Sequence, residues 1–325
     1  MLLIITNKSD FTSDYLILRL EKLNIPFWRL NTEDYLSKYQ IEIHLWNNSI
    51  KSCINYFDGR VIETNKIRGV YFRQPIVPNL SFEITESELE FAQRETLEVL
   101  RSLWRIIDER LWLNHPKYLL LANNKIDQLQ RAVKLGFNIP PTCISTNSNT
   151  IRNFYRSFNG DIIAKAVKHG FYKRKQSVQI TPTQKVDKHF IDNINDYAKV
   201  PMIFQKRIEK EYDIRVTVVG NQVYAAAIHS QEHEETKIDW RLWDMHHDVD
   251  LKHSKFDLPN RIARLCLKIT QEFNLNFSAI DLIYSTDNKY YFLEMNPNGQ
   301  WAWIEEKVGF PIRDSIINCL VPTRS

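Results

Sequence analysis

The sequence predicts an α+β protein built from three parts, and three observations support this. The chain opens on a strand–helix–strand pattern, continues with helices that alternate with strands, and ends on two long hairpins. With 325 residues, of which 43% are hydrophobic and 25% charged, it is long enough for two or three ordinary globular domains. We expect these domains at residues 1–115, 116–200 and 201–325.

Charge and cysteine content narrow the class of protein. The 43 Lys and Arg residues against 39 Asp and Glu give a net charge of +4, which is too small to predict a nucleic-acid partner. The four cysteines are far apart, as is typical of reduced thiols in a cytoplasmic protein. The apolar run at the N-terminus is too short for a signal peptide, and no other run is long enough to cross a bilayer. We therefore expect a cytoplasmic protein with no membrane partner.

The first part begins with a strand, a helix and a second strand within residues 2–30, which is typical of half a nucleotide-binding fold. No glycine follows the first strand, so a dinucleotide is not expected. A three-stranded meander comes next, then a strand that ends near Arg73 and an amphipathic helix over residues 86–110. Arg73 can contact a substrate or form a surface ion pair. The long helix can support a homodimer or cover the core of its own domain.

The middle part carries two isolated lysines and a basic run. Lys125 lies in the first turn of a helix, where a cation is unfavourable for the helix dipole. It either contacts a phosphate outside the helix or is a solvent-exposed surface lysine. Lys165 interrupts an apolar strand and needs a phosphate partner or a route to solvent. The run at residues 168–175 can receive phosphates or an acidic partner, or form a solvated face. Its last three residues are Lys173, Arg174 and Lys175.

The last part begins with a strand at residues 201–208 and a hairpin around Gly220-Asn221. Strict alternation makes one face of the hairpin apolar, and Asp213 and Arg215 point together from the other. These two residues form either an exposed ion pair or an arginine that stabilises phosphoryl charge, positioned by the aspartate. A histidine-rich loop follows, but its spacing does not suit zinc.

A second hairpin is expected within residues 278–305, around the turn Asp287-Asn288. In a symmetric hairpin Asp281 faces Glu294 directly, and Asn296 points to the same side. Opposed carboxylates repel unless a cation lies between them. Three oxygen donors without His or Cys suit Mg²⁺ that holds phosphate oxygens. The alternative is a solvated face on which two acids meet by chance.

Together these motifs resemble the ATP-grasp fold and, within it, the graspetide synthetases, which are microviridin-type peptide ligases. The resemblance covers about residues 114–320 and rests on the segments QKRIEKEYDIRVTVVG, DWR and EMNPNGQWAWIE, with YFRQP in the N-terminal part. It implies an ATP-grasp fold with a Rossmann-like N-terminal domain, a central α/β subdomain and a C-terminal antiparallel-sheet subdomain.

The resemblance also implies roles for individual residues. Lys125 and Lys165 would contact the phosphates of ATP, and Glu211 or Asp213 would lie near the ribose or the reacting centre. Arg215 and Arg241 would stabilise the transferred phosphoryl group. The adenine hinge would consist of Gln205, Lys206, Arg207 and Ile208. The Mg²⁺ ligands would be Asp281, Glu294 and Asn296.

The implied activity is ATP-dependent macrocyclisation of a ribosomal precursor peptide. ATP would phosphorylate an Asp or Glu side chain of the peptide, and a Ser or Thr hydroxyl or a Lys amine would then close an ω-ester or ω-amide link. We expect the leader of the precursor near Lys173, Arg174 and Lys175, with Arg73 as a further contact. The alternatives are an ATP-grasp amino-acid ligase of the glutamate-ligase type and a non-catalytic peptide-binding protein.

Overall fold

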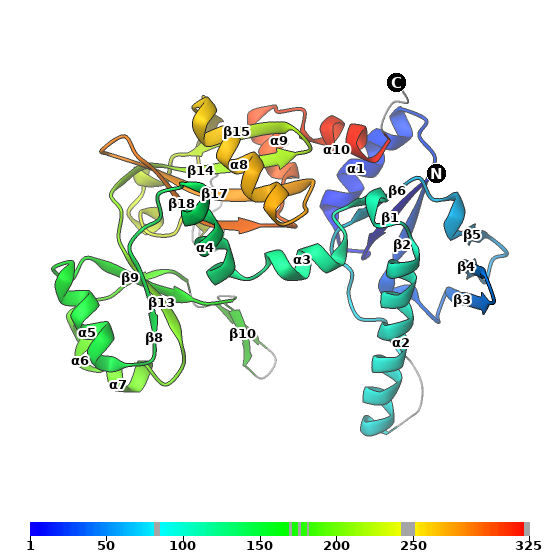
Figure 1. The fold of residues 1–325 in the computed structure, drawn as a ribbon, viewed down its shortest axis with the longest axis horizontal. Coiled ribbons are helices and arrows are strands. Elements are labelled where there is room, and N and C mark those ends of the chain that lie inside the picture. The colour runs from blue at the N-terminus through cyan, green and yellow to red at the C-terminus, as the bar shows by residue number, and fades with distance from the viewer. Residues whose placement is uncertain (81–84, 169–170, 175–176, 181, 242–250, 322–325) are drawn as a thin grey trace.

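The computed structural model combines helices with five separate sheets (Figure 1). It describes residues 1–80, 85–168, 171–174, 177–180, 182–241 and 251–321, with backbone only between 171 and 180. None of the helices in these ranges has both the length and the hydropathy needed to cross a membrane.

A four-stranded parallel sheet forms the centre of the N-terminal part, in the order β2-β1-β6-β7. Its strands are β1 (Leu2–Thr6), β2 (Phe27–Asn31), β6 (Gly69–Phe72) and β7 (Trp112–Leu113), with helix α1 (Phe11–Lys22) after the first. The predicted meander is present as β3 (Tyr39–Trp46), β4 (Ser49–Tyr56) and β5 (Val61–Glu63). The opening strand–helix–strand pattern therefore does form one parallel layer, as predicted.

Helix α2 spans Glu86–Ile106 and ends earlier than the predicted residue 110. Its start is fixed by a capping box, in which the Thr85 hydroxyl accepts from the Glu88 backbone and the Glu88 carboxylate accepts from the Thr85 backbone. At the other end Ile107 is extended, and the carboxylate of Asp108 accepts from the backbone N–H of Arg110 at 3.0 Å. The aspartate thus begins a separate short turn in place of a further turn of α2.

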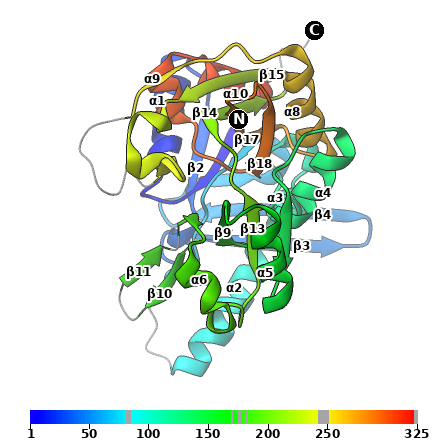
Figure 2. The same ribbon diagram turned by 90° about the vertical axis from the view of Figure 1, so that its left-hand side faces the viewer.

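The middle part is an antiparallel sheet in the order β12-β9-β13-β8. Its strands are β8 (Thr142–Ser145), β9 (Ile162–Ala166), β12 (Gln184–Lys185) and β13 (Met202–Lys206). The helices α5 (Ser148–Ser157), α6 (Lys188–Asp192) and α7 (Ile194–Tyr197) supply Ile151, Phe190 and Ile194 to its core. A separate hairpin, β10 (Phe171–Arg174) and β11 (Ser177–Ile180), projects from this lobe (Figures 1 and 2).

The C-terminal part is a five-stranded antiparallel sheet in the order β16-β15-β14-β17-β18. Its strands are β14 (Lys210–Val219), β15 (Gln222–Ile228), β16 (His253–Lys255), β17 (Phe277–Ser285) and β18 (Tyr290–Asn296). Helices α4 (Lys125–Leu135) and α8 (Asn260–Glu272) pack on the apolar face predicted from the alternation, against Val216, Ile280 and Phe292. The polar face is left for the functional side chains.

The end of the second hairpin differs from the prediction. Strand β18 stops at Asn296, and the chain then forms helices α9 (Ala302–Val308) and α10 (Ile312–Leu320). Gly309 ends α9 with a φ of +74°, a conformation that suits glycine. The segment WIE thus belongs to a helix, because Pro297 cannot donate to a ladder and the chain turns away from the sheet there.

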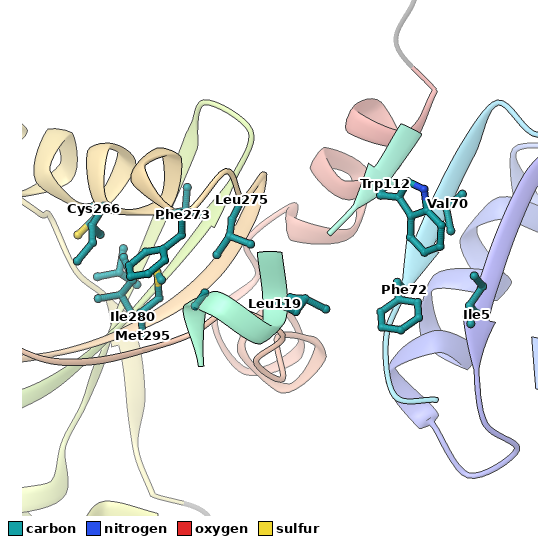
Figure 3. Close-up of a cluster of buried hydrophobic side chains, with 14 of the residues drawn as sticks. Ile5, Val70, Phe72, Trp112, Leu119, Cys266, Phe273, Leu275, Ile280 and Met295 are labelled. Atoms are coloured by element: carbon teal, nitrogen blue, oxygen red, sulfur yellow. The ribbon is translucent and has the colours of Figure 1, made fainter. Parts of the chain in front are cut away.

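Helix α3 (Pro116–Ala122) joins the N-terminal and C-terminal parts. Its Leu119 belongs to a single apolar cluster that contains Phe72 and Trp112 on one side and Phe273 and Met295 on the other (Figure 3). A second cluster joins Leu16 of α1 to Trp301 and Ile316. The two parts are therefore packed together and share buried apolar surface.

Candidate active site

Three charged side chains form a row across neighbouring strands on the polar face of the C-terminal sheet. Arg215 of β14 pairs directly with Asp281 of β17, which pairs directly with Glu294 of β18. The Nη1 of Arg215 donates to Oδ1 of Asp281 at 2.7 Å. Between this pair and the turn the register is one residue away from the predicted one, with Leu282 opposite Phe292, and a β-bulge between Asp281 and Leu282 restores the predicted pair. The predicted opposition of the two acids is therefore present.

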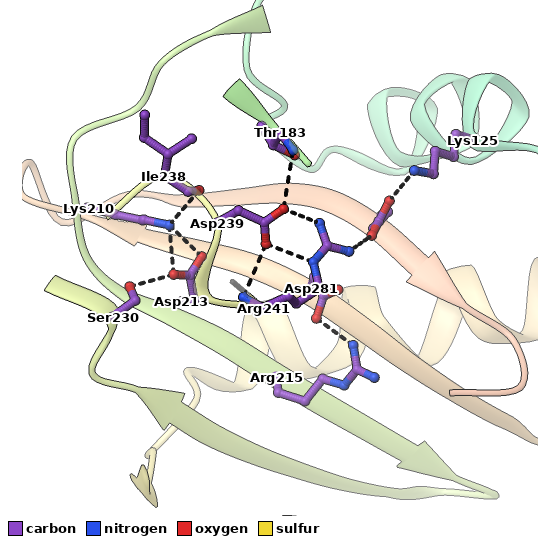
Figure 4. Close-up of polar contacts among 11 residues, drawn as sticks. Lys125, Thr183, Lys210, Asp213, Arg215, Ser230, Ile238, Asp239, Arg241 and Asp281 are labelled. Atoms are coloured by element: carbon purple, nitrogen blue, oxygen red, sulfur yellow. Dashed lines mark hydrogen bonds and ion pairs between the residues drawn. The ribbon is translucent and has the colours of Figure 1, made fainter. Parts of the chain in front are cut away.

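Two further cations converge on Glu294. Lys125 at the start of α4 lies with its Nζ 2.9 Å from Oε2, and Arg241 from the loop after β15 donates from Nη1 to Oε1 at 3.1 Å. Figure 4 shows Lys125 and Arg241 approaching from different elements. Burial by itself would raise the pKa of Glu294, but Lys125, Lys165 and Arg241 hold it well below its usual range. This acid is therefore ionised.

Asp281 lies in the opposite electrostatic situation. Burial raises the pKa of its carboxyl, Glu294 adds to the rise, and Arg215 only partly offsets it. Four cations surround the two carboxylates: Arg215 bonds Asp281, Lys125 and Arg241 contact Glu294, and Lys165 acts on Glu294 from further away. Asn296 pairs with Ala279 and adds an amide oxygen on the same face.

The donor set suits Mg²⁺. No cluster of three His, Cys, Asp or Glu side chains that could hold a metal exists in the part of the chain that the structure describes, so zinc-type ligation has no support there. Two carboxylates and an amide are oxygen donors that leave about half of an octahedral shell to water and phosphate, as suits Mg²⁺. Asp281, Glu294 and Asn296 therefore fit such an ion.

A cleft lies beside Asp281 and Glu294 and is lined by strands of both the middle and the C-terminal sheets. Lys165 of β9 lines it from one side, and Asp281 and Glu294 line it from the other. Burial lowers the pKa of Lys165 to about 8, and the nearby charge of Glu294 only partly offsets this. Among the described residues Lys165 forms no ion pair, because Glu294 is paired with Lys125 instead. Its ammonium group is therefore available to a ligand.

The predicted hinge also lines the cleft, at the end of β13. Gln205, Lys206, Arg207 and Ile208 are all lining residues. The Nε2 of Gln205 donates to Thr142 Oγ1 at 2.9 Å, whereas its buried Oε1 has no partner among the described residues. Such an acceptor suits an amino group of a ligand. The guanidinium of Arg207 is already bound to Asp161 at 2.6 Å, so its contribution to the cleft is the stem and backbone.

Of the two residues expected near the ribose or the reacting centre, Asp213 lines the cleft and Glu211 does not. Asp213 does not position Arg215, because its carboxylate accepts from Lys210 at 2.7 Å and from Ser230 at 2.6 Å (Figure 4). Glu211 is exposed and does not line the cleft, since the register of β14 shifts between Lys210 and Tyr212. In a regular strand Lys210 and Asp213 would point to opposite faces, and the bulge brings them together. Lys210 was missed because no sequence signal marks that bulge.

The remaining predicted contacts lie elsewhere. Arg73 is only 1% exposed and binds Asn298, so it offers no surface to a peptide. The side chains of Lys173 and Arg174 and the whole of Lys175 lie outside the described residues. Asp239, which sequence reasoning did not single out, holds Arg241 through Nε at 2.8 Å and Nη2 at 3.0 Å. The arginine is thereby aimed at Glu294.

Comparisons with known proteins identify the family of each part of the chain. Residues 122–320 match the model of the RimK-like ATP-grasp domain, and residues 1–119 match that of the MvdD pre-ATP grasp domain. No curated protein sequence matches the chain significantly.

Solved structures are similar over the whole chain. A RiPP-associated ATP-grasp ligase from Chryseobacterium gregarium, in complex with ADP and a leader and core peptide, is 26% identical, with a TM-score of 0.90 and coverage of 100% of this chain and 97% of that chain. The macrocyclase MdnC from Microcystis aeruginosa MRC, bound with precursor peptide MdnA, is 27% identical, with a TM-score of 0.84 and 99% of both chains covered. The ATP-grasp ligase PsnB, with minimal precursor, Mg and ADP, shares the fold at 18% identity and a TM-score of 0.75, with 98% of both chains covered.

Proposed function

The chain belongs to the RimK-like ATP-grasp family, and we propose that it is an ATP-dependent macrocyclase that cross-links a ribosomal precursor peptide. The resemblance to the graspetide synthetases is confirmed by the match of residues 1–119 to the MvdD pre-ATP grasp domain and by the similarity to macrocyclases over the full chain. The fold is the ATP-grasp fold expected from the sequence. Such a protein is a ligase that couples ATP hydrolysis to bond formation.

One observation carries the proposal most directly. Asp281 and Glu294 line a cleft that Lys165 and the hinge after β13 also line, and Arg215 bonds Asp281 beside it. Nucleotide phosphates in that cleft would meet Lys125 and Lys165, and adenine would lie against Gln205 and Ile208. Bound Mg²⁺, held by Asp281, Glu294 and Asn296, would neutralise phosphate charge.

The chemistry requires activation of a carboxylate, which is a poor acyl donor. A side-chain carboxylate oxygen of the peptide attacks the terminal phosphorus of ATP, the bond to ADP breaks, and an acyl phosphate forms. A Ser or Thr hydroxyl or a Lys amine then attacks the acyl carbon, inorganic phosphate leaves, and the nucleophile gives up a proton. Arg215 and Arg241 would stabilise the negative charge of the phosphoryl group, while the protein contributes position and charge and no covalent nucleophile.

The partner that follows is a precursor peptide with an acidic core and a leader. The ligase from Chryseobacterium gregarium was solved with a leader and core peptide, and MdnC was solved with precursor peptide MdnA, which supports a peptide partner. We place the leader near the β10–β11 hairpin, and we further propose a cytoplasmic location and domains at 1–115, 116–200 and 201–325. A homodimer remains a proposal that rests on the long helix α2 alone.

The test is ATP-dependent loss of water from the precursor, followed by mass spectrometry. Arg215→Ala and Asp281→Asn should abolish this loss, because each breaks the row beside the cleft. Lys188→Met is a matched control, since Lys188 pairs with Asp192 on the surface, where its side chain is 84% exposed. Normal turnover in either site variant would refute the assignment.

ADP release separates the proposal from its alternatives. A macrocyclase should release ADP only with the precursor and without any free amino acid. Release that requires a free amino acid would indicate an amino-acid ligase. Peptide binding without ADP release under any condition would indicate a non-catalytic binding protein.

A further inference from the structure

The loop that follows Asn296 is held by the N-terminal part of the chain at four positions. The four partners come from α1, β6 and the segment after β7, which are remote from the loop in sequence. Asn114 donates to the carbonyl of Pro297 at 2.9 Å, Arg73 binds Asn298, Thr12 donates to Gln300, and the indole N–H of Trp301 donates to Tyr71 at 2.9 Å. The loop beside the candidate metal site is thus built against another domain.

The contact between Arg73 and Asn298 runs in both directions. Nη1 of Arg73 donates to the backbone carbonyl of Asn298 and, at 3.1 Å, to its Oδ1, while Nδ2 of Asn298 donates to the backbone carbonyl of Arg73. Nε and Nη2 of Arg73 are buried without a hydrogen-bond partner in the described part of the chain. A buried guanidinium with unmatched donors is expensive, so stability alone does not explain an arginine here.

Asn298 in turn orients Asn296. Its backbone N–H donates to Oδ1 of Asn296 at 3.0 Å, and that oxygen keeps a second lone pair for a cation. The next residue, Gly299, packs so closely on β17 that an added Cβ would lie 2.5 Å from the Cβ of Ala279 and 3.2 Å from Nη2 of Arg215. The loop therefore has little room to shift.

The strand before the loop is held independently. Gln128 of α4 donates to the carbonyl of Met295 at 2.7 Å and accepts from its N–H at 2.8 Å. Met295 is thereby fixed by the ATP-grasp part itself, whereas Asn296 depends on Asn298 and, through it, on the N-terminal part.

We propose that Arg73 is a positioning residue for the metal end of the active site. It fixes Asn298, and Asn298 fixes the side-chain amide of Asn296 in the orientation that a cation needs. This role replaces the expected contact of Arg73 with peptide. The inference rests on the proposed function, which assigns Asn296 to Mg²⁺.

The inference can be tested without turnover by measuring the affinity of the full chain for ADP by calorimetry, with and without Mg²⁺. Arg73→Met should lower the affinity for ADP in the presence of Mg²⁺ by roughly tenfold, which is the lower end of the effect of losing a partner of a metal ligand. Its affinity for ADP without metal should equal that of the wild type. Arg68→Met is the matched control, because Arg68 is exposed and its guanidinium donates to the carbonyls of Asn65 and Ile67.

Two further variants sharpen the result. Arg73→Lys should not restore the loss, because a lysine cannot reproduce the planar fork of donors. Asn298→Ala removes both side-chain contacts with Arg73 but keeps the backbone carbonyl and N–H of residue 298, so it should show a loss in the same direction that is no larger than that of Arg73→Met. The double variant should lose no more than Arg73→Met alone, since the two residues act in one chain of contacts. Should Arg73→Met fail to fold, Asn298→Ala, which removes no buried charge, decides the same comparison.

The two proposals fail in different ways. Wild-type affinity for ADP that does not depend on Mg²⁺ would refute the metal site itself. The positioning role of Arg73 would be overturned in two cases, provided that the affinity of the wild type for ADP depends on Mg²⁺. In the first, Arg73→Met binds ADP with Mg²⁺ as tightly as the wild type. In the second, Arg73→Met loses the same affinity for ADP with and without Mg²⁺.

Discussion

Nucleotide binding at alkaline pH should take up a proton through Lys165. This lysine faces Glu294 of β18, Lys125 of α4, and Arg241 with Asp239 of the loop, and burial lowers its pKa from 10.5 to about 8. A nucleotide phosphate placed beside it would favour the charged form and raise the pKa again. Binding and protonation are therefore linked.

The pKa of Lys165 sets how many protons the protein takes up when the nucleotide binds. At pH 8.5 about three quarters of the Lys165 side chains are neutral in the free protein, so binding of MgADP should take up roughly 0.7 proton, against roughly 0.1 at pH 7. Calorimetry in buffers of different ionisation enthalpy measures this uptake. The phosphates of ADP are already ionised at pH 8.5 and contribute little.

Lys165→Arg isolates the contribution of this residue. Arginine stays charged at both pH values, so the variant should take up almost no proton at pH 8.5 while it still binds nucleotide. Equal uptake by the wild type and the variant, or no uptake by the wild type, would refute the placement of Lys165 beside the phosphates. The same pKa predicts that the contribution of Lys165 to the free energy of unfolding rises with pH between about 8 and 10.5, because in that range the unfolded chain binds more protons than the folded one.

Three further perturbations test other parts of the site. Lys210→Met leaves the Asp213 carboxylate buried without its cation and should lower the free energy of unfolding by about 3 kcal/mol, measured in urea. Gln205→Leu removes the buried acceptor at the hinge and should weaken ADP binding by roughly threefold to tenfold with little change in melting temperature. Neutralising the basic run should weaken binding of a labelled leader peptide in a salt-dependent way, with ADP affinity unchanged. The residues changed are Lys173, Arg174 and Lys175.

Each of these has a control. Lys188→Met removes an exposed pair with Asp192 and should cost less than about 1 kcal/mol, so an equal loss from Lys210→Met would contradict the buried pair. Wild-type ADP affinity in Gln205→Leu would exclude its acceptor from adenine recognition. Neutralising exposed cations on α2 should leave leader binding unchanged, and the leader assignment fails if the basic run behaves in the same way. The α2 cations are Arg94, Arg101 and Arg105.

Local patterns predicted the opposed acids only in part. Strand alternation has a period of two and places Glu294 and Asn296 on one face. The pairing of Asp281 with Glu294 also depends on the β-bulge between Asp281 and Leu282, because the ladder next to the turn is one residue away from the register of a symmetric Asp287-Asn288 turn. The same reasoning assigned the apolar face of the first hairpin and the side on which Arg215 points. The Gly136 stop of α4 was equally readable, because its φ of +93° suits only a residue without a side chain.

These local patterns do not predict which side chains far apart in the sequence contact one another. Arg215 and Asp213 share a face, but the sheet order β14-β17 gives the arginine to Asp281 instead, and a bulge gives Asp213 to Lys210. Arg73 looked like a surface contact because an isolated arginine at the end of a strand usually is one, yet the packing of the two domains buries it against Asn298.

Residue types and local spacing thus predict two acids and an amide on one sheet face, cations proposed for phosphate, and a family resemblance that the comparisons confirm. Which cation meets which acid, and the contact of the N-terminal domain with the loop beside Asn296, depend on the tertiary structure. The difference lies in the sequence separation of the residues involved. Alternation and turn chemistry act over a few residues, whereas the order of strands and the packing of domains depend on contacts between residues hundreds of positions apart, such as Arg73 and Asn298, which are 225 residues apart.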